Sequence, residues 1–140
     1  MDREAIKNTS RMVVKFGTGI LTNRSKQIDP CQIEQLVAQV AAQRQAGREI
    51  IVVSSGAVGA GMGMLAMNKR PTDLSDLQAC AAIGQSQLMS TYTELFARHN
   101  MQVAQVLLTH DDIEHQERHL NARNTLVSLL EKGVVPIVNE

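Results

Sequence analysis

Four short apolar runs alternate with three longer amphipathic segments, and this order most constrains the fold. The runs cover residues 12–16, 50–53, 101–108 and 134–138, and their length and β-branched content are typical of strands. Strands separated by helices favour right-handed crossovers and a parallel sheet. We therefore predict an α/β protein with a parallel-type sheet sandwiched between helices, ending after about its fourth strand.

The helical segments carry recognisable start and stop signals. Asp29 precedes a proline and Asp73 precedes the second helix, so both are candidate N-caps; Gly133 closes the third helix. Pro136 predicts an edge, a bulge or a strand start, because proline cannot donate to a sheet. Gly84 costs a helix roughly 1 kcal/mol relative to Ala, which indicates close helix packing. The predicted buried face of the second helix comprises Leu77, Ala81, Gly84, Leu88, Thr91 and Leu95.

Polar or glycine-rich segments follow three of the predicted strands. These are residues 17–19, 54–56 and 139–140. Ligands of parallel α/β sheets bind at the carboxyl ends of the strands. Three such strand ends at one edge of the sheet therefore indicate a binding site there.

Lys15 lies inside the first apolar run, directly before the glycine-rich turn. A desolvated ammonium costs several kcal/mol as an order of magnitude, and a phosphate oxygen would be a suitable partner, joined by the backbone N–H groups of the turn. The alternative is an edge-strand lysine whose ammonium reaches water. Residues 54–57 leave a similar choice between an anion-binding helix start and a turn in which serine merely caps.

Standard signatures of other sites are missing from the sequence. Neither the Walker phosphate loop nor Gly-x-Gly-x-x-Gly occurs, and Ser55 lacks the Gly-x-Ser-x-Gly context of a nucleophile. His115 and His119 are four residues apart, but the acidic residues around them favour a solvated charged face over a metal site. We therefore predict no metal ligands in this chain.

Charge and composition limit the partners. Fourteen basic residues balance fourteen acidic ones, and aromatic residues make up 2% of the chain, which argues against a nucleic-acid surface. No signal peptide or membrane-length apolar run is visible. Cys31 and Cys80 are predicted to be buried thiols in a reducing compartment. A cytoplasmic protein without membrane or nucleic-acid partners is expected.

Several segments, taken together, carry a family resemblance. They read VVKFGT at 13–18, VVSSGAVGAG at 52–61, AIGQS at 82–86, LLT at 107–109, ER at 117–118, LNARNTL at 120–126 and VPIVNE at 135–140. They resemble the amino-acid kinase superfamily and, within it, the glutamate 5-kinase family, over almost the entire chain. Relatives acting on aspartate or N-acetylglutamate typically carry Gly-Gly after the lysine, and this chain does not.

The resemblance implies ATP-dependent phosphorylation of the γ-carboxylate of L-glutamate to glutamyl 5-phosphate, the first step of proline biosynthesis. Mg²⁺ would accompany ATP. Lys15 would be catalytic, and Gly19 is the weaker phosphate site because the family usually has serine there. The implied phosphate and ATP site comprises Lys15, Gly17, Thr18 and Gly19, and the implied glutamate site comprises Ser55, Gly56, Ala57 and Asn139.

The resemblance also implies an amino-acid kinase fold in which residues 1–140 form the N-terminal, glutamate-side part. The nucleotide-binding half would lie outside this chain, so the isolated chain is expected to be inactive and to leave its last strand exposed. A homo-oligomer at full length and feedback inhibition by proline are further implications. The alternatives are a kinase of another small carboxylate and a non-catalytic module that binds an amino acid or an anion.

Overall fold

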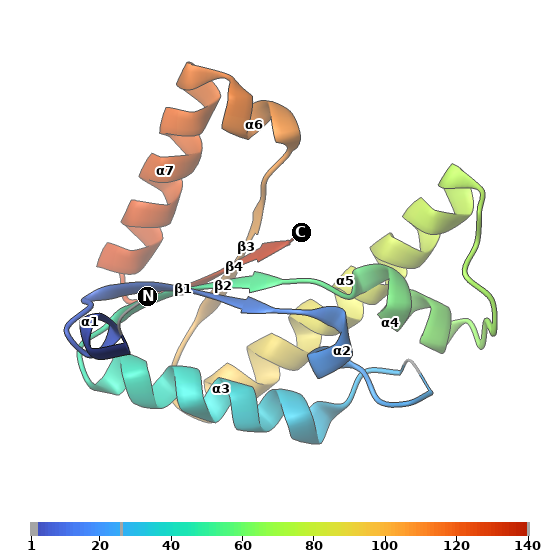
Figure 1. Ribbon diagram of the computed structural model, residues 1–140, viewed down its shortest axis with the longest axis horizontal. Helices are drawn as coiled ribbons and strands as arrows, with labels where there is room; N and C mark the ends of the chain where they lie inside the picture. The colour runs from blue at the N-terminus through green and yellow to red at the C-terminus, as the bar shows by residue number, and fades with distance from the viewer. Residues whose placement is uncertain (1–2, 26, 140) are drawn as a thin grey trace.

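Four parallel strands form the centre of the protein. The computed structural model describes residues 3–25 and 27–139. The strands are β1 (Arg11–Phe16), β2 (Glu49–Ser54), β3 (Val103–Leu107) and β4 (Val135–Asn139). They pair in the order β1-β2-β4-β3, and every pairing is parallel (Figure 1). The predicted α/β class and parallel sheet are confirmed.

Helices cover both faces of this sheet. They are α1 (Arg3–Lys7), α2 (Thr18–Leu21), α3 (Pro30–Gln45), α4 (Ala57–Met64), α5 (Leu74–Ala97), α6 (His110–Glu114) and α7 (Gln116–Glu131). Figure 1 shows α3 and α5 on one face, α7 on the other, and α4 beyond the carboxyl end of β2. The predicted sandwich is therefore confirmed, and α4 is the element that lies where ligands of such sheets bind.

The predicted helix signals act as expected. The Asp29 carboxylate accepts a hydrogen bond from the Gln32 N–H at 3.2 Å, and Asp73 accepts one from the Ser75 N–H at 3.2 Å. Gly133 follows α7 with φ of +73°, the left-handed backbone that ends helices. The short helix α2 was not predicted. The turn after β1 begins it, with Gly17 as the N-cap.

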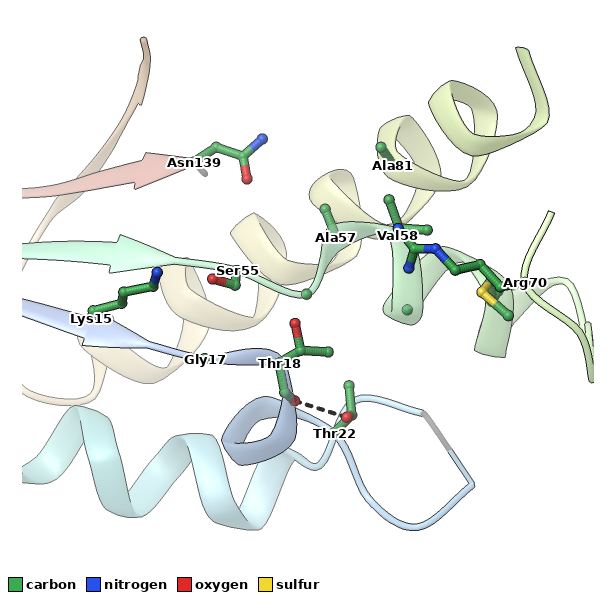
Figure 2. Close-up of a pocket in the computed structure, with 13 residues that line it drawn as sticks. Lys15, Gly17, Thr18, Thr22, Ser55, Ala57, Val58, Arg70, Ala81 and Asn139 are labelled. Atoms are coloured by element: carbon green, nitrogen blue, oxygen red, sulfur yellow. Dashed lines mark hydrogen bonds between the residues drawn. The ribbon is translucent and has the colours of Figure 1, made fainter. Parts of the chain in front are cut away.

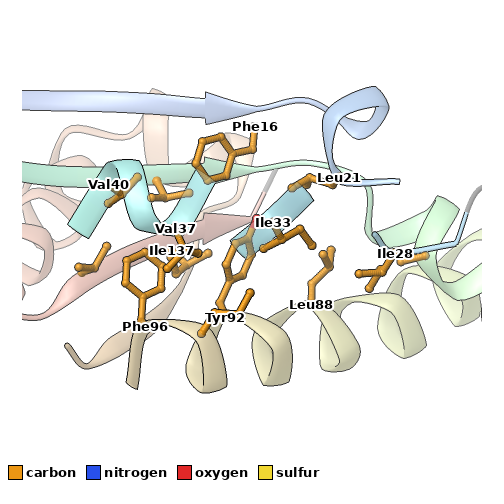
Figure 3. Packing of buried hydrophobic residues seen from close by; sticks show 14 of the residues in the cluster. Phe16, Leu21, Ile28, Ile33, Val37, Val40, Leu88, Tyr92, Phe96 and Ile137 are labelled. Atoms are coloured by element: carbon orange, nitrogen blue, oxygen red, sulfur yellow. The ribbon is translucent and has the colours of Figure 1, made fainter. Parts of the chain in front are cut away.

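The main core lies between the sheet and helices α3 and α5 (Figure 3). The buried residues of α5 are Cys80, Gly84, Leu88, Tyr92, Leu95 and Phe96. Of the predicted row, Gly84, Leu88 and Leu95 are buried, whereas Leu77, Ala81 and Thr91 are half-buried. Thr91 is half-buried and its hydroxyl donates to the Gln87 carbonyl at 3.0 Å, while the neighbouring Tyr92 points inward. Large aromatic side chains bury more apolar surface than threonine, so they set the orientation of the helix.

A smaller core lies under α7. Ile51, Val106, Leu130 and Val138 are buried there. The helix covers β2, β3 and β4 on this face but leaves β1 open, since Val13 is 65% exposed. Apolar surface is thus left at the edges of the sheet.

The last strand differs from its prediction. We expected β4 to be left exposed, but it lies between β2 and β3 and its first four residues are buried. Of the three places predicted for Pro136, the strand start is the one observed, because the pairing of β4 with β2 begins at Ile137. Cys31 also departs from its prediction, since this thiol is exposed on α3, whereas Cys80 is buried.

Candidate functional site

A cavity of about 680 Å³ opens at the carboxyl ends of β1, β2 and β4 (Figure 2). Among the residues that the structure describes, its lining includes two cationic side chains, Lys15 and Arg70, and no carboxylate. Such a charge distribution favours an anionic ligand. The lining residues are Lys15, Gly17, Thr18, Thr22, Ser55, Gly56, Ala57, Val58, Gly59, Met62, Arg70, Ala81 and Asn139.

Lys15 reaches this cavity from β1. In Figure 2 its side chain runs from the strand toward the space beside Ser55 and Asn139. β1 is an edge strand and Lys15 is exposed. The ammonium is therefore not desolvated, in contrast to the phosphate-based interpretation of the sequence. The structure instead combines the two alternatives, because an edge-strand lysine with a hydrated ammonium also faces the cavity.

The turn between β2 and α4 presents backbone rather than side chains. Gly56 is the N-cap of α4 with φ of +94° and has no side chain with which to cap the helix. Neither Ser54 nor Ser55 occupies the N-cap position, and the choice between an anion-binding helix start and a turn capped by serine stays open. The first N–H groups of a helix have no partner inside it and carry the positive end of its dipole. With glycine at the cap, the backbone N–H groups of Ala57 and Val58 are available to an anion.

The two turns that follow β1 and β2 lie against each other. The Ser55 N–H donates to the Phe16 carbonyl at 3.0 Å. A Cβ added at Gly56 would lie 3.5 Å from the Thr18 Cα, so the turns are in van der Waals contact. The Thr22 hydroxyl donates to the Thr18 carbonyl at 2.9 Å (Figure 2). Apart from Gly19, the residues predicted for phosphate and for glutamate line one cavity.

Two glycine contacts fix α4 against α5. A Cβ at Gly84 would lie 1.8 Å from the Ala57 carbonyl oxygen, and a Cβ at Gly61 would lie 1.9 Å from that of Cys80. Both distances are impossible for real atoms, so only glycine allows this approach. The close packing predicted at Gly84 is confirmed, and it holds the first turn of α4 in place.

Beneath the second turn, Ser54 and Tyr92 form a buried polar pair. Burial raises the pKa of Tyr92 to about 12, and the hydrogen bond with Ser54 opposes that rise. The phenol is therefore neutral at physiological pH. Ser55, the next residue, is the one that reaches the cavity.

Asn139 ends β4 at the opposite wall of the cavity. The residue is half-buried, and its Oδ1 atom is buried without a hydrogen-bond donor among the described residues. An unsatisfied buried acceptor costs about 1–3 kcal/mol. A ligand with an N–H group, such as the ammonium of an amino acid, would satisfy it.

Sequence reasoning missed part of this lining and included one residue outside it. Arg70 and Thr22 were not predicted, because each lies in a segment without a motif. Gly19 does not line the cavity; it lies in α2, and its role in phosphate binding stays a prediction. The other predicted positions, from Lys15 to Asn139, surround one space, and their roles are proposals.

Neither a metal-ligand cluster nor a membrane-spanning helix is found in the part of the chain that the structure describes. Among the side chains that the structure describes, no three His, Cys, Asp or Glu residues gather in a group that could hold a metal ion. No helix in this part of the chain has the length and apolar character needed to cross a bilayer.

The fold and this cavity agree with the family that the sequence matches. Residues 10–140 match the amino acid kinase family, and the chain belongs to that family. Curated relatives named glutamate 5-kinase come from Azoarcus sp. (strain BH72), Aromatoleum aromaticum (strain DSM 19018 / LMG 30748 / EbN1) and Ralstonia pickettii (strain 12J). They are 51%, 48% and 50% identical to the chain over 99%, 99% and 96% of its length. The chain spans 37%, 37% and 36% of those relatives.

Solved structures support the same fold at low identity. An isopentenyl phosphate kinase aligns with a TM-score of 0.58 at 15% identity, covering 92% of this chain and 56% of its own. The T. acidophilum isopentenyl phosphate kinase product complex aligns with a TM-score of 0.60 at 14% identity, covering 93% and 54%. At such identity the likeness concerns the fold alone.

Proposed function

We propose that this chain supplies the glutamate side of an enzyme that phosphorylates the γ-carboxylate of L-glutamate with ATP, giving glutamyl 5-phosphate. The observation that carries the proposal is the cavity in which Lys15, the start of α4 and Asn139 converge, with no carboxylate among the lining residues that the structure describes. The relatives named glutamate 5-kinase support glutamate as the acceptor.

The side chains and amides of the cavity suit this transfer. ATP, when bound, supplies the phosphoryl group that passes to the carboxylate. The acceptor is already ionised at neutral pH, so no general base is needed, and catalysis rests on positioning and charge neutralisation. Lys15 stabilises charge on the transferred group. Ser55, Gly56 and Ala57 hold the acceptor carboxylate. The side-chain Oδ1 atom of Asn139 accepts a hydrogen bond from the ammonium of glutamate.

The lining fits the phosphates of ATP better than it fits a protein-bound metal. Gly17 and Thr18 bring backbone to the cavity beside Lys15, and an ammonium with backbone N–H groups is a common phosphate cradle. Among the described lining residues no carboxylate is present, and hard cations prefer oxygen ligands of that kind. Mg²⁺ in this proposal enters with the ATP phosphates.

Further parts of the proposal rest on the family resemblance. The enzyme would act in the cytoplasm in proline biosynthesis, would form a homo-oligomer, and would be inhibited by proline. The adenosine of ATP would be held by residues outside these 140. On that account the isolated 140-residue chain would bind glutamate without turning over ATP.

An acceptor comparison tests the proposal. The full-length product of the gene is incubated with ATP and, separately, with L-glutamate, L-aspartate and N-acetyl-L-glutamate, and ADP release is measured. We expect release with L-glutamate, at a kcat/KM at least about tenfold above the other two acceptors. A preference for another carboxylate would identify that compound, and not L-glutamate, as the substrate. Glutamate binding without ADP release would favour a non-catalytic binding module.

A further inference from the structure

We infer that Arg70 is a specificity-determining residue that binds the α-carboxylate of the acceptor, at the end of the cavity away from Lys15. The inference rests on the proposed function and deepens it. Arg70 belongs to the segment between α4 and α5, and it was singled out by the structure and not by any motif. Its guanidinium lines the same cavity as Lys15 and the start of α4.

No residue that the structure describes acts as a counter-ion for Arg70. Arg11 pairs with Glu49 at 2.7 Å and Arg98 pairs with Glu34 at 2.7 Å. Arg70 makes no hydrogen bond or ion pair with any residue that the structure describes, and no described lining residue of the cavity is acidic. A guanidinium that faces an anion-binding cavity without a partner is ready to bind a carboxylate.

The backbone is restrained on both sides of Arg70, whose side chain is exposed. The Met67 N–H donates to the Met62 carbonyl at 2.9 Å at the end of α4, and the Cys80 thiol lies 3.7 Å from the Met67 sulfur. Pro71 follows Arg70 directly and restricts its backbone to extended conformations. The segment therefore limits the backbone conformations at Arg70, which lowers part of the entropic cost of binding.

The two cations lie at different ends of the cavity. In Figure 2, Lys15 lies beside the ends of β2 and β4, while the Arg70 side chain extends toward Val58 on the far side of the first turn of α4. Glutamate is a dicarboxylate with an anion at each end. With its γ-carboxylate beside Lys15 and the transferred phosphoryl, its α-carboxylate would reach toward Arg70, whose planar fork can bind it through two hydrogen bonds.

The test compares two acceptors that differ only at the α-carboxylate. L-Glutamate and its α-amide both keep the γ-carboxylate, and only the first has a group for Arg70. In the full-length protein, Arg70→Gln is expected to raise the KM for L-glutamate on the order of tenfold or more. The KM for ATP and kcat/KM for the α-amide are expected to stay within about twofold. Arg70→Lys keeps the charge without the fork and should give an intermediate KM.

Matched variants separate a binding role from a structural one. Lys69→Gln removes the adjacent positive charge from the same segment but outside the cavity lining, and should leave the KM for both acceptors unchanged. Thermal unfolding of each variant checks that the fold is kept. An equal loss with glutamate and its α-amide, or a raised KM for ATP, would overturn the inference. A wild-type protein that phosphorylates neither acceptor would instead overturn the proposed function itself, before any variant is compared.

Discussion

The hydroxyl of Tyr92 lies 2.9 Å from the Oγ atom of Ser54, and both side chains are buried beneath the turn that carries Ser55. This contact joins the middle of α5 to the last residue of β2. The same helix meets the first turn of α4 at Gly84. The core helix α5 therefore supports two sides of the candidate site, although only Ala81 of it lines the cavity.

Removing the phenol hydroxyl tests that support. Tyr92→Phe leaves the Ser54 hydroxyl buried without this partner, and we expect the free energy of unfolding to fall by about 1–2 kcal/mol. Urea denaturation measures the loss. In a double-mutant cycle with Ser54→Ala, the second substitution should cost less in the Tyr92→Phe background, because the bond is already absent. Strict additivity would show that the two hydroxyls do not interact.

The raised pKa of Tyr92 predicts a loss of stability in alkaline solution. Its folded pKa of about 12 exceeds the ordinary value of 10.0 because burial disfavours the phenolate. The unfolded chain therefore loses this proton first, and the stability that the neutral phenol contributes is present below pH 10 and is lost between pH 10 and 12. The shift corresponds to about 2–3 kcal/mol. Tyr92→Phe should flatten this part of the stability profile, and an unchanged slope would contradict the assignment.

Gly84→Ala should damage the helix contact. Alanine normally stabilises a helix interior by up to about 1 kcal/mol relative to glycine, but here its Cβ would meet the backbone carbonyl of Ala57 at 1.8 Å. Because backbone cannot move aside cheaply, we expect a net loss of about 1–3 kcal/mol and weaker binding in the cavity. Gly19→Ala is the control for stability, since nothing lies within 4 Å of its added Cβ. A stabilised Gly84→Ala protein would contradict the contact.

Two glycines with left-handed backbone conformations allow the effect of backbone strain to be distinguished from an effect on binding. Gly56 and Gly47 have φ of +94° and +86°, so alanine at either should cost about 1–2 kcal/mol of stability. Gly47 ends α3 outside the cavity, whereas Gly56 begins the turn that holds the ligand. We expect Gly56→Ala alone to lower kcat/KM for L-glutamate, by about tenfold or more, in the full-length protein. Equal activity of the two variants would place the ligand elsewhere.

The fold was predictable because it depends on repeated patterns. Strand runs, the caps at Asp29 and Asp73 and the glycine after α7 are local signals, and each is found where it was expected. The position of β4 inside the sheet was not predictable, since strand order depends on which faces the crossover helices cover. The inward orientation of Tyr92 also depended on a tertiary partner, the hydroxyl of Ser54.

The candidate site was predictable only in part, for a similar reason. Lys15 and the residues from Ser55 to Ala57 follow strands, so topology alone brings them to one edge. Arg70 comes from a connecting segment whose path is set by the packing of α4 on α5. No spacing in the sequence encodes that path, which depends on close contacts between the two helices such as that of Gly61 with Cys80.

Lys15→Ala in the full-length protein tests the central claim most directly. The acyl phosphate formed from L-glutamate and ATP is trapped with hydroxylamine, and the hydroxamate is measured for wild type, Lys15→Ala and Lys7→Ala. Lys7 is the control because its ammonium pairs with Glu4 at 2.6 Å on the surface of α1. We expect hydroxamate from wild type and Lys7→Ala, and a loss of about a hundredfold or more for Lys15→Ala. Undiminished hydroxamate from Lys15→Ala would contradict the account.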